Sequence, residues 1–252
     1  MPDALSLLPP DISVSTALLL VTVSFFTSAL TAAVGIGGGV ALLAVLASVA
    51  SPLVVLPVHG VVQIGSNAGR AGLLRADIRW DIVRPFALGS IIGCTAGAAA
   101  FTALPVTTLQ FLLAVFILYS VWAPRLRPAN IPLWGFAPVG AVATFCTMFV
   151  GATGPMLAAF LSPVRFPRHH VVATHAMCMS LQHSLKVLAF GLLGFNYGPW
   201  LLLLGLMIGS GFIGTIAGRY VLNRLPEKLF IRGFQIVLTL LALRLLWSAW
   251  YG

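Results

Sequence analysis

The sequence predicts an all-α fold, a polytopic bundle of transmembrane helices built from two five-segment repeats of inverted topology. Three observations predict it. Of the 252 residues, 60% are hydrophobic and only 8% are charged, whereas a soluble domain carries about 25% charged residues. Apolar stretches near the length of a membrane span follow one another along the chain. The glycine cluster GIGGG at 35–39 also has a counterpart, GATGP, at 151–155. We therefore expect residues 1–252 to form a single transmembrane domain.

The first half divides at proline, glycine and charged residues into five apolar segments. The segment 12–34 has no charge after Asp11, and 36–50 begins within GIGGG. The segment 53–74 carries a polar stripe, 83–103 begins in the arginine-containing loop, and 106–123 follows Pro105. Since a helix needs about 20 residues to cross about 30 Å of hydrocarbon, the second segment is short for a span.

The second half divides in the same way. The segment 132–150 follows a basic loop, and 152–162 is short and lies within and after GATGP. The segment 170–193 carries a second polar stripe, 199–221 begins at Pro199, and 229–250 follows Lys228. The sequence thus predicts about ten segments, with the two short ones each led by a glycine cluster.

A single offset of 116 positions relates the two halves, about 12–123 and 132–250. The offset pairs Gly35 with Gly151, Gly38 with Gly154, His59 with His175, Arg70 with Lys186, Gly89 with Gly205 and Gly93 with Gly209. Because each repeat holds an odd number of segments, ten crossings would place the second repeat upside down. Inverted repeats with paired, glycine-interrupted segments are typical of secondary transporters.

Basic residues predict the orientation in the membrane. With ten crossings they gather in the loops 75–84, 124–131, 163–169 and 220–228, and the loops on the other side carry no charge. Lysine and arginine mark the cytoplasmic side, so we expect a multi-pass membrane protein with both termini outside. The net charge of +9 is then a sign of orientation in a lipid bilayer and not of nucleic-acid binding.

Two segments carry polar stripes that end in a cation. The stripes have a spacing of three or four residues and consist of His59, Gln63, Ser66 or Asn67, and Arg70, and of His175, Met179, Gln182 or His183, and Lys186. Charge inside a bilayer costs about 2.5–3.5 kcal/mol, so such residues normally face a cavity or the interior of a bundle. No predicted membrane segment contains an aspartate or glutamate that could pair with Lys186, which favours the binding of an anion near this residue. Alternatively, Arg70 anchors the helix at the interface, and the amides and histidines hydrogen-bond between helices.

The glycine clusters predict a second feature of the same site. GIGGG is not followed by the GK[ST] of a P-loop, and it has neither the preceding strand nor the acidic residue of a dinucleotide-binding fold. Glycine at a helix N-terminus is nevertheless suited to anion binding. We therefore place Gly35, Gly37, Gly38, Gly39, Gly151 and Gly154 along the path of a small anion. Whether the clusters share one midplane site or form two gates stays open. For Gly89, Gly93, Gly97, Gly205, Gly209, Gly214 and Gly218 we expect close helix packing.

Other chemistries have less support. The three cysteines show no CxxC spacing, and we expect the His169–His170 pair to have no nearby third ligand, so we expect no metal site and no cofactor. A membrane enzyme is disfavoured because Ser184, adjacent to His183, points elsewhere on the helix. A transition-metal exporter that uses His59, His175 and His183 is the alternative, with a sparse ligand set.

The stretches GIGGG, PVHGVVQIGSNAGRAGLL, GATGPMLAAFL and VVATHAMCMSLQHSLKVLAFGLLG resemble the sulfite exporter TauE/SafE family. The resemblance implies an inner-membrane transporter of sulfite, sulfoacetate or other small organosulfur anions, with the glycine clusters in the substrate path. The chain departs from many members at His59–Gly60, where they have a Thr-Ser pair, so the substrate is not carried over. Together with the residues above, this predicts a secondary transporter, an exporter of small anions by alternating access.

Overall fold

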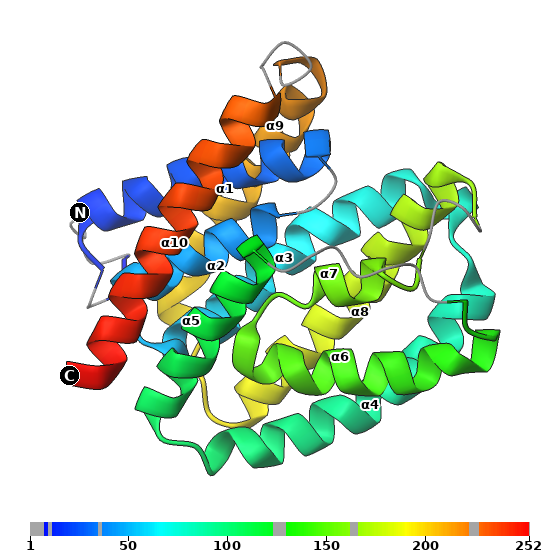
Figure 1. Cartoon of the computed structure of the whole chain (residues 1–252), viewed down its shortest axis with the longest axis horizontal. Coiled ribbons are helices and arrows are strands. Elements are labelled where there is room, and N and C mark those ends of the chain that lie inside the picture. The colour runs from blue at the N-terminus through cyan, green and yellow to red at the C-terminus, as the bar shows by residue number, and fades with distance from the viewer. Residues whose placement is uncertain are drawn as a thin grey trace.

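The structure, a computed structural model, describes residues 8–9, 12–34, 37–122, 130–161, 166–221 and 227–251. Within these residues all regular secondary structure is helical: ten α-helices and three short 3-10 turns, with no strand (Figure 1). The all-helical prediction is therefore confirmed for the part of the chain that the structure describes.

The helices of the first half are α1 (Val14–Val34), α2 (Gly38–Val49), α3 (Pro52–Leu73), α4 (Trp80–Thr102) and α5 (Val106–Trp122). A 3-10 turn, η2 (Arg75–Asp77), joins α3 to α4. These bounds lie within a few residues of the predicted segments, because prolines and glycines mark most of the helix ends.

The helices of the second half are α6 (Phe136–Val150), α7 (Gly154–Ala158), α8 (Arg168–Leu192), α9 (Leu201–Val221) and α10 (Glu227–Tyr251). The turns η3 (Leu133–Gly135) and η4 (Gly198–Trp200) precede α6 and α9. Several residues of the predicted basic loops, among them Arg125, Arg127, Arg165 and Arg224, lie outside the described residues.

The glycine-led helices are both short. At about 1.5 Å per residue, the 12 residues of α2 rise about 18 Å and the 5 residues of α7 about 7.5 Å. Neither helix alone crosses about 30 Å of hydrocarbon. The apolar stretch predicted at 152–162 is α-helical over only half of its described part: α7 ends at Ala158, and a turn and a bend follow through residue 161.

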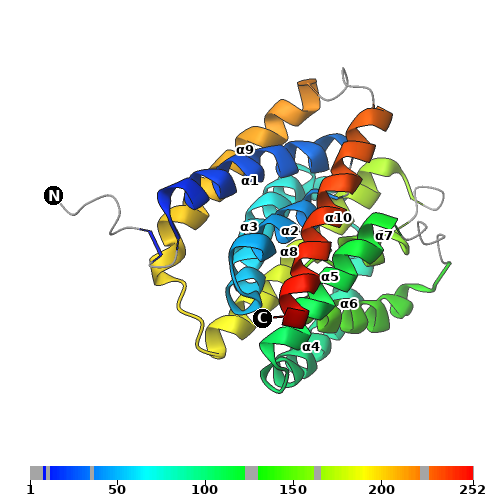
Figure 2. The same ribbon diagram turned by 60° about the vertical axis from the view of Figure 1, so that its left-hand side comes forward.

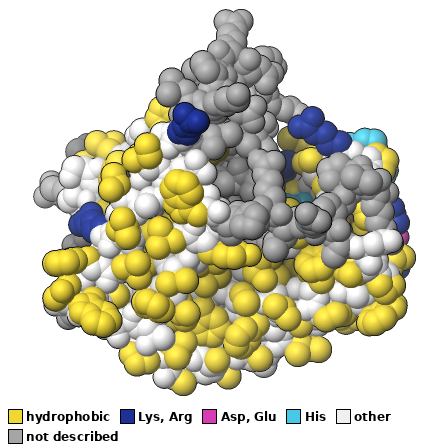
Figure 3. Space-filling model, viewed as in Figure 1, with side chains coloured by type: hydrophobic (Ala, Val, Ile, Leu, Met, Phe, Trp, Pro, Cys, Tyr) yellow, Lys and Arg dark blue, Asp and Glu magenta, His cyan; other side chains and the backbone are white. Residues whose placement is uncertain are grey.

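Among the described residues, four helical stretches are long and apolar enough to cross a membrane: Val14–Ala32, Trp80–Thr102, Leu133–Val150 and Gly198–Gly218. Hydrophobic side chains cover most of the described surface seen in Figure 3, and the few lysines and arginines there lie towards its edges. An apolar outer surface of this extent is what a lipid environment requires.

Two close helix pairs flank the bundle: α4 runs along α6, and α1 runs along α9 (Figures 1 and 2). In the first pair, a Cβ at Gly89 or Gly93 would collide with the backbone of Ala137 or Ala141. In the second pair, a Cβ at Gly214 would collide with the backbone of Phe25. Glycine is needed here because it lets the backbones approach.

The packing role predicted for the glycines is confirmed at Gly97 and Gly218 as well, since both face neighbouring helices within contact distance. It is wrong for Gly205 and Gly209. Both are exposed, and a Cβ at either position would meet no heavy atom within 4 Å. Their face of α9 has no neighbouring helix within the described chain.

Inside these pairs, α3 packs against α8 and α5 packs against α10. The short helices α2 and α7 lie nearer the middle of the bundle: α2 contacts α3, and α7 contacts α8. This arrangement brings the starts of the two glycine-led helices next to the polar stripes of α3 and α8.

Candidate functional site

A polar pocket lies where the starts of α2 and α7 meet α3 and α8. Its empty space is about 480 Å³, including the open mouth. Nine residues predicted for the site line it: Gly37, Gly39, His59, Gln63, Asn67, Arg70, Gly154, His175 and His183. Five more lining residues were not among the predicted site residues: Thr31, Val40, Ala152, Pro155 and Met179. The predicted stripes of α3 and α8 therefore face the same space.

Both glycine clusters border this one pocket, through Gly37 and Gly39 at α2 and through Gly154 at α7. Gly37 has a φ of 109°, which favours glycine, and caps α2. The first backbone bond of α2 runs from the N–H of Ala41 to the carbonyl of Gly37, at 3.0 Å. The amides before Ala41 therefore have no partner within the helix, and the positive end of α2 borders the pocket.

Each of two histidines holds the start of one glycine-led helix. Nε2 of His59 on α3 lies 2.9 Å from the carbonyl oxygen of Gly39, and Nε2 of His175 on α8 lies 3.0 Å from that of Gly154. A neutral ring that donates its Nε2–H to a carbonyl cannot give the same proton to a ligand. In this arrangement both histidines are positioning residues for the helix starts.

Gln63 lies one turn after His59, and its Nε2 is 3.1 Å from Nε2 of the histidine. When His59 donates to Gly39, this contact is not a hydrogen bond, because both nitrogens then carry hydrogen. Asn67 donates to the side-chain oxygen of Gln63 at 3.2 Å, which orients the amide. The amide hydrogens of Gln63 are thus left for a ligand in the pocket.

Arg70 is the cation that lines the pocket. The contact of its Nη2 with the hydroxyl of Ser66 is long, 3.5 Å, and its buried Nε has no hydrogen-bond partner. No carboxylate is among the residues that line this pocket. A guanidinium with unused donors and no acid beside it is suited to an oxyanion.

Four other predicted site residues lie behind the pocket wall, namely Gly38, Gly151, Gln182 and Lys186. Lys186 is fully buried, and its Nζ donates to the carbonyl of Gly151 at 3.3 Å. Gln182 donates to Thr153 Oγ1 at 2.5 Å. Gly38 packs against α1, where a Cβ would collide with the backbone of Thr27. Gly35 lies outside the described residues.

Comparison with known proteins identifies the family of the chain. The model of the sulfite exporter TauE/SafE family matches residues 5–245, nearly the whole chain. The chain belongs to the sulfite exporter TauE/SafE family. No curated protein and no solved structure matches it. Membership places this chain in a family of membrane transporters of sulfur anions, and the apolar helices agree with an embedded protein.

In this TauE/SafE member, Gly151 and Gln182 support the α7 side of the pocket. Gly151 has a φ of 77°, and a Cβ there would lie 2.6 Å from Cδ1 of Leu43. Its carbonyl accepts a hydrogen bond from Lys186. It accepts a second one, 3.1 Å long, from the Thr147 hydroxyl. The break between α6 and α7 is therefore fixed by buried polar contacts from two helices.

Sequence reasoning missed the short side chains of the pocket in this TauE/SafE member. Thr31 is the last hydroxyl residue of α1 before the glycine cluster, and Ala152 lies between two predicted glycines. Their positions beside GIGGG and within GATGP were the available signal. Small residues next to a glycine cluster are easily taken for packing, which is why they were not selected.

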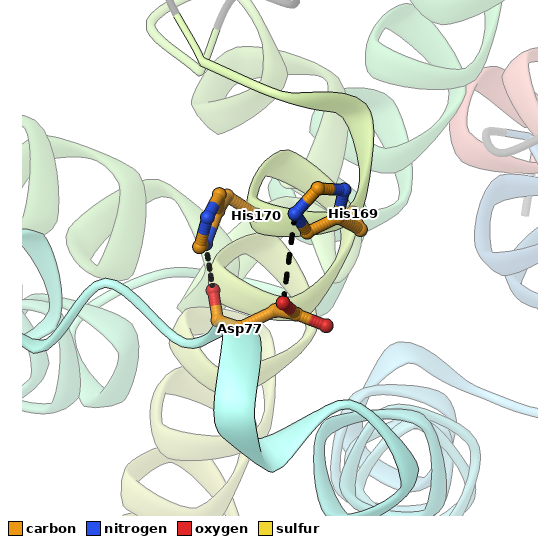
Figure 4. Close-up of side chains that lie close together, drawn as sticks. All are labelled: Asp77, His169 and His170. Atoms are coloured by element: carbon orange, nitrogen blue, oxygen red, sulfur yellow. Dashed lines mark hydrogen bonds and ion pairs between the residues drawn. The ribbon is translucent and has the colours of Figure 1, made fainter.

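The expectation that His169–His170 lacks a third ligand is wrong. Asp77, from the turn after α3, lies beside the pair at the start of α8 (Figure 4). The three cysteines are free.

Proposed function

We propose that this protein is a secondary transporter that exports small sulfur oxyanions, such as sulfite or organosulfonates, and that the anion binds in the pocket between α2, α3, α7 and α8. The observation that carries the proposal is the Arg70 guanidinium in a pocket that also receives both glycine-led helix starts and no carboxylate. A doubly charged oxyanion finds positive potential there from a side chain and from the end of α2.

Each polar group of the proposed site has a distinct role. Arg70 supplies the charge and paired N–H donors that match a planar or pyramidal oxyanion. The amides at the start of α2 supply further donors, and the Gln63 amide orients the anion. Lys186, one turn beyond His183, adds positive charge behind the wall without touching the ligand, since its Nζ is bonded to Gly151.

The inverted repeat is part of the proposal, and the helix packing supports it. The offset of 116 maps α1 onto α6 and α4 onto α9, so the close pairs α1–α9 and α6–α4 exchange places. It also maps α3 onto α8 and α5 onto α10, and each of these helices packs against its own counterpart. A two-fold axis between the halves would produce this pattern.

We propose alternating access as the mechanism. The pocket lies between helices of both repeats, so rocking of one half against the other would expose it to either side in turn. The family description names export as the direction of transport. We place the protein in the plasma membrane with both termini outside. The anion would then leave the cell down its electrical gradient, with or without a coupled proton.

Metal export has less support from the pocket. Nε2 of both His59 and His175 is directed at a backbone carbonyl, so these rings would have to turn to coordinate an ion. Neither cysteine nor carboxylate is among the residues that line the pocket. The donor set favours an anion over a transition metal.

The proposal is tested by counterflow of labelled sulfite, sulfoacetate and thiosulfate into proteoliposomes. We compare the wild type with Arg70→Gln and with Arg75→Gln, an exposed arginine at the same end of α3. The proposal expects uptake by the wild type and by Arg75→Gln, and a loss of about tenfold or more in Arg70→Gln. Equal uptake of every anion by all three proteins would reject Arg70 as the anion ligand, and no uptake by the wild type would reject the three anions as substrates.

A further inference from the structure

A second cluster of metal-binding side chains lies away from the pocket, where the chain leaves α3 and where α8 begins. Asp77 ends the turn η2, and His169 and His170 belong to the first turn of α8 (Figure 4). One possible ligand atom from each residue lies within 4.8 Å of the others. The three residues come from segments more than 90 positions apart, so only the fold brings them together.

The hydrogen bonding of His170 leaves one of its ring nitrogens for a metal ion. Its Nδ1 lies 2.7 Å from the backbone carbonyl oxygen of Asp77, so Nδ1 carries the proton and donates it there. The lone pair of a neutral ring is then on Nε2. Metal-binding histidines commonly donate their second nitrogen to a carbonyl in this way, which fixes the tautomer and the orientation of the ring.

The spacing of the other two ligands is also close to what a metal ion needs. Nε2 of His169 lies 3.6 Å from Oδ1 of Asp77. Two ligands at about 2.0–2.2 Å from a tetrahedral zinc ion are about 3.4 Å apart. The His169 ring is exposed, and Asp77 is partly exposed. Rotation of these side chains, and of the His170 ring so that its Nε2 turns towards them, would bring the three ligand atoms onto one ion.

The backbone beneath the cluster is held in place. The N–H of Arg79, two residues after Asp77, donates to the Thr174 hydroxyl of α8 at 3.0 Å. The Arg79 guanidinium in turn bonds the carboxylate of Asp81, which leaves Asp77 as the carboxylate beside the histidines. This anchoring fixes η2 against α8 before any ion arrives, which lowers the entropy cost of binding.

The surroundings select the kind of ion. Arg168 precedes the histidines, and the start of α8 is the positive end of a helix. These positive charges oppose any divalent cation, and Mg²⁺ or Ca²⁺, which prefer several oxygen ligands, would have only one carboxylate to offset them. An ion of the zinc class forms strong bonds to neutral imidazole and needs only one carboxylate.

We propose that Asp77, His169 and His170 form a binding site for a divalent transition-metal ion of the zinc class, which links the turn after α3 to the start of α8. Three protein ligands leave a fourth position for water, as in open zinc sites. The site is separate from the anion pocket and does not depend on transport. Since α3 and α8 carry the two polar stripes, the ion would hold together one end of that helix pair.

Zinc titration of the purified full-length protein by isothermal calorimetry, after removal of metal with a chelator, tests the proposal. The variants are Asp77→Asn, which keeps the backbone carbonyl and the shape, and His169→Gln. The matched control is Asp81→Asn, which removes the same charge four residues further along. Circular dichroism and melting temperature in chelator check that the variants are folded.

We expect one zinc ion per chain in the wild type and in Asp81→Asn, and at least about tenfold weaker binding in Asp77→Asn and His169→Gln. Two results would overturn the proposal. One is the absence of saturable binding by the wild type. The other is equal binding by all four proteins, which would place the ion elsewhere, for example at the histidines of the pocket.

Discussion

Nε2 of His175 lies 3.0 Å from the carbonyl oxygen of Gly154, and His59, 116 positions earlier, makes the same kind of contact with Gly39 at 2.9 Å. Each histidine comes from a long helix and holds the first turn of a short one. The two contacts bring both glycine clusters to one pocket. The proposed repeat thus has a counterpart in side-chain contacts at the candidate site.

His175→Ala tests this anchoring role. The substitution leaves the carbonyl of Gly154 without its partner and removes a half-buried ring, at a cost of about 1–3 kcal/mol. We expect a lower melting temperature and faster hydrogen exchange in residues 154–161 than in the wild type. His169→Ala, measured in chelator, is the control because that ring is exposed. Unchanged exchange at α7 would show that His175 does not hold this helix.

Gly39→Ala tests the approach of Gln63 to the start of α2. A Cβ at residue 39 would lie 2.6 Å from Nε2 of Gln63, so the amide must move away. We expect sulfite affinity to fall by about tenfold, equivalent to about 1.4 kcal/mol, while the protein stays folded. Gly72→Ala on α3 is the control, since nothing lies within 4 Å of its added carbon. Equal sulfite binding by both variants would argue against a role for this amide.

Two glycines of α9 give a matched pair for helix packing. Gly214→Ala places a methyl group against the backbone of Phe25 on α1, whereas Gly209→Ala meets no atom within 4 Å. Overpacking costs about 1–3 kcal/mol. We expect a clear fall in the melting temperature in detergent for Gly214→Ala and almost none for Gly209→Ala. Similar melting temperatures would contradict the close α1–α9 contact.

Lys186 contributes both packing and charge, and two substitutions separate them. Lys186→Ala removes a fully buried stem that packs against Gly60, and we expect it to lower stability by about 2–5 kcal/mol. Lys186→Met keeps most of the volume and should lose much less. Because Met removes the charge behind the pocket, its KM for sulfite should rise while expression and melting temperature stay near those of the wild type. A KM equal to that of the wild type would limit Lys186 to a structural role.

Much of the pocket could be predicted from local periodicity. A spacing of three or four residues puts His59, Gln63, Asn67 and Arg70 on one face of a helix, and this face does line the pocket. The same reasoning could not separate His183, which lines the pocket, from Lys186, one turn further along α8, because both belong to the same stripe and both are polar. Side-chain direction along a helix depends on its neighbours, which a single sequence does not reveal.

Other features depend on contacts between distant segments. Glycine spacing alone does not tell which face of α9 meets a neighbour, so Gly205 and Gly209 were assigned to packing although they are exposed. The composition of 152–162 is apolar throughout, which does not distinguish a short helix followed by a turn from a longer helix. Asp77 joins His169 and His170 only because η2 folds against α8, so the third ligand was not visible from the histidine pair.

The most direct test of the anion site is a structure of the protein with selenite, a heavier analogue of sulfite, located by the anomalous scattering of selenium. The account predicts one strong peak in the pocket, within hydrogen-bonding distance of the Arg70 guanidinium and the first turn of α2. The peak should be absent from Arg70→Gln under the same conditions. A peak at another place in the wild type, with this pocket empty, would contradict the account.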